Sequence, residues 1–151
     1  MLEKILPEKI DNNFPGHKFA AHAFLVLTII TIARSLAHMF LPDGGAELIA
    51  TIDVSVEGGV TIIGMFAQWG LSQLLMAGLY VIVFVRYKSL IPLMYLIIFA
   101  EYAGRIGMGL LKPIETIGTA PGGSIGSLII LYLAIIFFVF SIRPPKQNVE
   151  S

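Results

Sequence analysis

The sequence contains no cysteine. This absence excludes disulfide bonds, thiol-based catalysis, and metal or cluster sites that use cysteine ligands. Charged residues are also scarce, since Asp, Glu, Lys and Arg make up only 13% of the 151 residues, whereas apolar residues make up 56%. A soluble domain of this length needs more polar side chains to cover its surface. The composition therefore predicts a single domain that lies in a membrane.

Sequence signatures of catalysis are missing as well. The chain has no serine, histidine and acid order typical of a hydrolase, no metal-ligand motif and no dinucleotide-binding glycine fingerprint. Its formal net charge is zero, which gives no indication of a nucleic-acid partner. The sequence leaves catalysis as the least supported class of function, names no cofactor and predicts no metal site.

Four long apolar runs are what the sequence has instead. They cover residues 19–40, 59–85, 92–111 and 125–142. Each approaches the roughly 20 residues that a helix needs to cross the hydrocarbon layer of a bilayer, and none alternates like a barrel strand. The short connections favour antiparallel neighbours. We therefore predict an all-α fold, an integral membrane antiparallel four-helix bundle over residues 19–142, with an N-terminal segment 1–18 and a tail 143–151.

The segment before the first run is polar and longer than a usual signal-peptide leader, and no small-residue cleavage pattern follows the run. We therefore expect the first helix to be retained. Leu2, Ile5, Leu6 and Ile10 fall on one face of a short helix, which favours an interfacial helix. A frayed polar tail remains the alternative, because chain termini are often poorly ordered.

The distribution of basic residues predicts the orientation in the membrane. The connection 41–58 contains four acidic residues and no Lys or Arg, whereas the N-terminal segment, the connection between the second and third runs, and the C-terminal tail are basic. By the positive-inside rule, both termini are predicted to be cytoplasmic. The basic residues on that side are Lys4, Lys9, Lys18, Arg86, Lys88, Arg143 and Lys146.

Three of the four runs carry polar side chains at helical spacing. In the third run, Glu101 and Arg105 are four residues apart, the spacing at which a helix lets an acid and a base pair. A charge near the centre of a bilayer costs about 3 kcal/mol or more, so we expect these side chains to turn toward a common interior. The predicted ligand-binding residues are Arg34 and His38 in the first run, Glu57 just before the second run, Gln68 within the second run, and Glu101 and Arg105 in the third run.

Two interpretations of these polar stripes stay open. In the first, two arginines outnumber one deep carboxylate, and the excess positive charge binds a small anionic or amphipathic ligand in a pocket in the outer half of the bundle. In the second, Arg34, Gln68, Glu101 and Arg105 form a closed hydrogen-bonded network that fixes the helix register. For Arg34 alone, a further alternative is that its side chain extends outward to the membrane surface.

Two further classes of function are considered. Ala100, Gly104 and Gly107 form a small-residue track that lets another helix approach closely, which suits a non-catalytic accessory subunit of a larger membrane complex or a homo-oligomer. A proton-coupled carrier or membrane enzyme would use Glu101 as its proton acceptor. That role suits Glu101 poorly, because the adjacent arginine stabilises the charged carboxylate.

Three short stretches resemble a known family. They are "HMFLPDGG" at residues 38–45, "EGGVTIIG" at 57–64 and "AGRIGMGLL" at 103–111. Over residues 24–142 the chain resembles the small bacterial four-helix membrane proteins of a DoxX-like domain of unknown function. The resemblance implies the four-helix fold and a prokaryotic cytoplasmic membrane, and it places Glu57, Gly58, Gly59 and Arg105 at the family's characteristic positions. Arg34, His38 and Glu101 depart from the pattern, and the family supplies no agreed reaction.

Overall fold

The computed structural model of the chain describes residues 2–117 and 122–144. All regular secondary structure in these ranges is helical. The prediction of four long apolar helices is confirmed, with ends that differ from the predicted ones by three residues or fewer. The elements are α1 (Leu2–Ile5), α2 (Lys18–Phe40), α3 (Gly59–Arg86), the short 3-10 helix η1 (Lys88–Leu90), α4 (Ile91–Leu111) and α5 (Gly122–Ile142).

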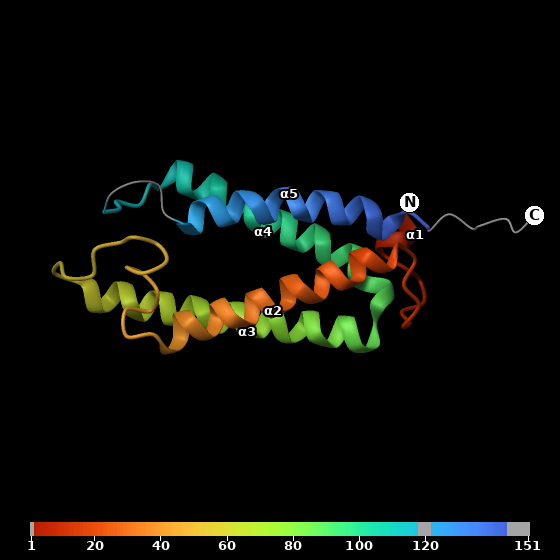
Figure 1. Ribbon diagram of the computed structural model, residues 1–151, viewed down its shortest axis with the longest axis horizontal. Coiled ribbons are helices and arrows are strands. Elements are labelled where there is room, and N and C mark those ends of the chain that lie inside the picture. Colours follow the sequence, from red (N-terminus) through yellow and green to blue (C-terminus); the bar gives the residue numbers. More distant parts are fainter. Residues whose placement is uncertain (1, 118–121, 145–151) are drawn as a thin grey trace, which may run out of the picture.

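The four long helices run along the long axis of the molecule in two pairs (Figure 1). Helix α2 packs mainly along α3, and α4 packs mainly along α5, while α2 also contacts α5. The N-terminal segment, the α3–η1–α4 connection and the end of α5 lie at one end of the molecule, which we call the N-terminal end (Figure 1). The connections 41–58 and 112–117 lie at the opposite end, the loop end.

Proline and glycine set the helix boundaries. Pro42 follows Leu41, the C-cap residue of α2. Pro92 occupies the first turn of α4, where a backbone N–H has no partner within the helix, so its absence breaks no helical hydrogen bond. Helix α3 begins with two glycines. Gly58 has φ of 88°, and a Cβ atom on Gly59 would lie 1.9 Å from the carbonyl oxygen of Val54. Only glycine therefore fits where the loop turns into α3.

The apolar core lies toward the N-terminal end. Phe24 of α2 is fully buried and makes edge contacts with two tyrosines, Tyr80 of α3 at 5.5 Å and Tyr95 of α4 at 5.7 Å between ring centroids. The Tyr95 hydroxyl donates a hydrogen bond of 2.6 Å to the carbonyl oxygen of Ala20. This aromatic cluster joins three of the four long helices and leaves the polar side chains closer to the loop end.

The outer faces of the long helices are apolar. Large hydrophobic side chains are exposed on every one of them, among them Val60, Leu75, Leu110 and Ile129. All four helices are long and apolar enough to cross a membrane, judged by length and composition. The molecule therefore carries its apolar side chains on the outside as well as in the core.

The N-terminal segment is attached to the helix ends. The predicted helical face of Leu2, Ile5, Leu6 and Ile10 is only partly formed, because α1 ends at Ile5, and Leu6 and Ile10 are exposed. The segment also contacts the α3–α4 connection. Its Asp11 backbone accepts hydrogen bonds from the hydroxyl and the amide of Ser89 at the α3–α4 connection.

Candidate functional site

The site begins with the close approach of α2 and α3. A Cβ atom on Gly70 of α3 would lie 2.8 Å from the Cβ of His38 and 2.9 Å from the carbonyl oxygen of Ser35, both on α2. The missing side chain thus lets the two helices touch one turn from the loop end of α2. This contact places the neighbouring Trp69 between α2 and α4.

Arg34 projects from α2 toward this tryptophan. Its guanidinium carbon lies 5.4 Å from the centre of the Trp69 ring and 5.8 Å from that of Tyr102 on α4. One of its nitrogens donates a hydrogen bond of 2.9 Å to the side-chain oxygen of Gln73 on α3. The head group of Arg34 therefore contacts both other helices.

Arg105 reaches the same two rings from α4. Its guanidinium carbon lies 4.5 Å from the centre of Trp69 and 4.9 Å from that of Tyr102. Arg105 also donates a hydrogen bond to Glu101 one turn earlier, which forms the predicted ion pair. Both members of the pair are mostly buried, with side-chain exposures of 20% for Arg105 and 23% for Glu101.

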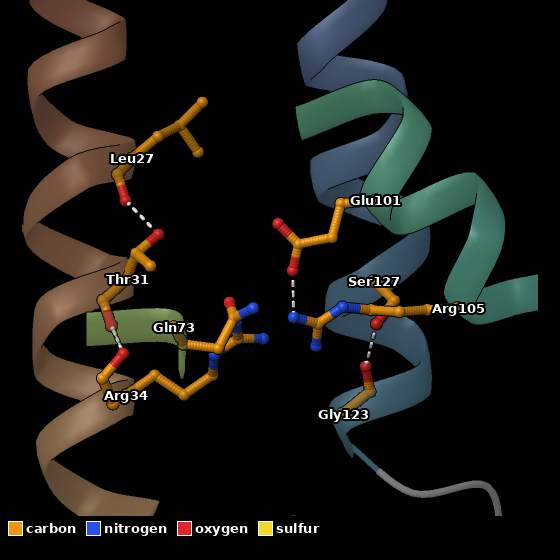
Figure 2. Close-up of polar contacts among 9 residues, drawn as sticks. Leu27, Thr31, Arg34, Gln73, Glu101, Arg105, Gly123 and Ser127 are labelled. Atoms are coloured by element: carbon orange, nitrogen blue, oxygen red, sulfur yellow. Dashed lines mark hydrogen bonds and ion pairs between the residues drawn. The ribbon is translucent and has the colours of Figure 1, made fainter. Parts of the chain in front are cut away.

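The two guanidinium groups face one another across the space between the helices (Figure 2). The structure thus brings three of the predicted residues, Arg34, Glu101 and Arg105, together in one cluster. Within the described residues, Arg34 has no carboxylate within 4.0 Å, and the one ion pair there is that between Glu101 and Arg105. The cluster of two cations and one carboxylate therefore carries an excess of one positive charge.

His38 lies beside this cluster but does not enter it. The imidazole is buried and packs at 4.8 Å from the ring centre of Trp69 and at 5.4 Å from that of Phe66. Its Nδ1 atom lies 2.8 Å from the carbonyl oxygen of Gly44. His38 therefore supports Trp69 from the side that faces the loop end.

The turn that carries Gly44 is held by Asp43. The carboxylate accepts hydrogen bonds from the backbone N–H groups of Leu48, Gly45 and Glu47 at 2.9 to 3.1 Å. These backbone N–H groups, first that of Leu48, hold the pKa of Asp43 below its ordinary value. An ionised Asp43 therefore fixes the turn that supports His38.

Two predicted residues lie away from the cluster. Glu57 is exposed in the connection before α3, and Gln68 is exposed on α3. Neither side chain makes a hydrogen bond in the part of the chain that the structure describes, since the hydroxyl of Ser72 donates to the backbone oxygen of Gln68 and not to its side chain. The place predicted for Gln68 is taken by Gln73, which bonds Arg34.

Gln73, Trp69 and Tyr102 are cluster residues that the sequence prediction did not assign to the site. Tyr102 is three residues before Arg105, and Gln73 is four residues after Trp69, so each pair shares one face of its helix. The signal in the sequence is the spacing of Gly70, Gln73, Ala77 and Tyr80 along α3. This stripe of small and polar residues marks the face that packs inward.

A small cavity adjoins the cluster on the side of the apolar core. It has a volume of about 10 Å³, and residues from all four long helices line it. The polar lining consists of Thr31, Gln73, Tyr80, Glu101 and Tyr102, and the apolar lining of Leu27, Ile98 and Ile130. The cluster and the cavity together form a continuous polar region inside an apolar helical molecule.

Comparison with known proteins gives no relative from which a function is transferred. No family model, no curated protein and no solved structure matches the chain. The described residues contain no group of three or more His, Asp or Glu side chains that would hold a metal ion. The chemistry of the site is therefore argued from the arginine cluster itself.

Proposed function

We propose that the chain is an integral membrane protein that binds a small anionic or amphipathic molecule through Arg34 and Arg105. The observation that carries this proposal is the unbalanced charge of the cluster. Arg105 is paired with Glu101, whereas Arg34 has Gln73 and two aromatic rings but no carboxylate. A guanidinium group that is half-buried without a counterion favours an anion, and its planar donor geometry suits a carboxylate or a phosphate.

The proposed setting is an antiparallel bundle of α2, α3, α4 and α5 in a prokaryotic cytoplasmic membrane. Four helices of sufficient length with apolar outer faces support this setting. Both termini are proposed to lie in the cytoplasm, which places the loop end on the outer side and the arginine cluster in the outer half of the bilayer. An amphipathic ligand would then place its charged group at the cluster and its chain in the surrounding lipid. Kinship with the DoxX-like proteins is part of the same proposal.

The role of Arg34 is tested with dodecyl phosphate, a single-chain anionic probe, on protein purified in a non-ionic detergent. We expect the probe to raise the melting temperature and to change the fluorescence of Trp69, the one tryptophan in the sequence. Arg34→Gln should weaken probe binding about 10-fold or more, because it removes a charged hydrogen-bond donor worth about 1.5–3 kcal/mol. The Glu101–Arg105 pair stays intact in this variant.

Arg86→Gln is the matched control, because Arg86 is exposed at the N-terminal end of the molecule. It should bind the probe as the wild type does. Equal binding by Arg34→Gln and wild type would contradict the proposal. Mass spectrometry of small molecules that remain bound to the protein after mild solubilisation then identifies the natural ligand.

A second candidate is an accessory subunit of a larger membrane complex or a homo-oligomer. The observation in its favour is the small-residue track of α4. Cβ atoms on Gly104 and Gly107 would have no neighbour within 4 Å, so the chain's own described residues do not fill this track. Chemical crosslinking in native membranes separates the two candidates. An accessory subunit is recovered with a stoichiometric partner, and this crosslink depends on Gly104 rather than on Arg34.

A further inference from the structure

The cavity beside the arginine cluster contains a buried polar group without a partner. Tyr80 lines the cavity and is only 2% exposed. Its hydroxyl has no hydrogen-bond partner in the described part of the chain. A buried hydroxyl without a partner costs free energy, and a bound molecule that hydrogen-bonds to it would offset this cost.

The other polar groups around the cavity have unused hydrogen-bonding capacity. The Thr31 hydroxyl donates to the carbonyl oxygen of Leu27 at 2.8 Å and keeps its acceptor lone pairs (Figure 2). One oxygen of Glu101 accepts from Arg105, which leaves the second oxygen, and Gln73 uses its oxygen for Arg34, which leaves its NH₂ group. The cavity therefore offers both donors and acceptors on three helices.

Size and charge decide which molecule fits. A volume of about 10 Å³ is close to the smallest that holds a single water molecule, and far below that of any organic ligand. The carboxylate of Glu101 disfavours an anion in the cavity. Arg105, bonded to that carboxylate, disfavours a cation. A neutral molecule of the size of water that both donates and accepts is the one that satisfies these conditions.

We infer that the cavity is a binding site for one internal water molecule, which links the Tyr80 hydroxyl to the free oxygen of Glu101 and to Thr31. The water satisfies the Tyr80 hydroxyl and donates a hydrogen bond to the Glu101 oxygen that Arg105 does not use. Tyr80 is in this sense a positioning residue for the ion pair of the cluster. The inference stands apart from ligand binding, because it concerns the protein without its ligand.

The test combines Tyr80→Phe with a high-resolution experimental structure. We expect an ordered water in the wild-type cavity and its loss in the variant. We also expect a melting temperature about 3 °C lower, because the variant loses the hydrogen bond from Tyr80 to the water. Tyr95→Phe, which removes a hydrogen bond to Ala20, should lower it by a similar amount, whereas Tyr132→Phe on an exposed helix face should not change it.

The sign of the change separates a filled cavity from an empty one. If the cavity were empty, removal of a hydroxyl without a partner would leave the melting temperature unchanged or raise it. A Tyr80→Phe protein as stable as the wild type, or a wild-type structure without an ordered water between Tyr80 and Glu101, would overturn the inference.

Discussion

Trp69 is the residue around which the cluster is organised, because its ring lies beside both guanidinium groups. Two cations on one ring repel one another, and each gains about 0.5–2 kcal/mol from the ring depending on how far it is removed from water. His38 and Phe66 pack on the same tryptophan and restrict its position. The arrangement is held by aromatic contacts, with one carboxylate instead of two, which leaves Arg34 without a carboxylate partner among the described residues.

Asp43 offers a prediction at the residue scale that depends on pH. The pKa of Asp43 in the folded protein lies below its ordinary value of 3.8, because backbone N–H groups bind the ionised carboxylate. The stabilisation is therefore present above about pH 4 and is lost as the pH falls through the folded pKa. We expect Asp43→Asn to lower the free energy of unfolding by about 0.5–1 kcal/mol at neutral pH, a modest value because the side chain is partly in solvent.

The measurement is the difference in melting temperature between the wild type and Asp43→Asn across pH. The difference should be constant at neutral pH, shrink as the pH falls from about 4 through the folded pKa of Asp43, and be close to zero below that pKa. A difference that stays constant into strong acid would mean that the charge of Asp43 does not stabilise the turn. Glu47→Gln in the same connection, with an exposed side chain, serves as the control.

At the scale of whole elements, the contact of α2 with α3 depends on Gly70. A methyl group there would lie 2.8 Å from the Cβ of His38, so the two helices must separate. We expect Gly70→Ala to destabilise the protein by about 1–3 kcal/mol through overpacking and to weaken the binding of dodecyl phosphate, because Arg34 and Trp69 move apart. Thermal unfolding in detergent measures the first effect.

Gly78 of the same helix provides the matched control. A Cβ atom at this position has no neighbour within 4 Å. Gly78→Ala should therefore leave the protein unchanged or stabilise it by up to about 1 kcal/mol through helix propensity. If both alanine variants behave alike, the close approach at Gly70 does not determine the site.

The helices themselves were predictable from the sequence, but the rotation of α3 was not. Long apolar runs bounded by Pro42, Gly58 and Pro92 determine where helices begin and end. Polar residues lie on more than one side of α3, so they do not by themselves indicate which face turns inward. Gln68 and Gln73 are five positions apart, which places them about 140° apart around the helix axis. The small size of Gly70 and Ala77 selects the face that carries Gln73.

The partners of the third run were easier to predict because they are local. Glu101 and Arg105 are four residues apart on one helix, so their ion pair follows from helix geometry alone. The contacts of Arg34 with Trp69 and Tyr102 join residues that are far apart in the sequence. They depend on how α2, α3 and α4 pack, and a single sequence without such packing information does not determine them.

At the scale of the whole molecule, the distribution of polarity supports insertion into a membrane. The four long helices expose large apolar side chains, whereas their ionised side chains other than Lys18 and Arg86 at the helix ends are gathered in the interior cluster. In water this arrangement would leave extensive apolar surface exposed and would favour aggregation. In a bilayer the same surface contacts lipid, and the cost of the buried charges is reduced by pairing and by aromatic contacts.

The orientation of the molecule is tested by single-cysteine labelling, for which the chain is well suited because it contains no cysteine. Ser55 is exposed at the loop end and Glu8 is exposed in the N-terminal segment. If both termini are cytoplasmic, Ser55→Cys reacts with a membrane-impermeant maleimide in intact cells, whereas Glu8→Cys reacts only after the membrane is permeabilised. The reverse pattern would place the arginine cluster in the inner half of the bilayer, and the ligand would then be a molecule of the cytoplasmic leaflet.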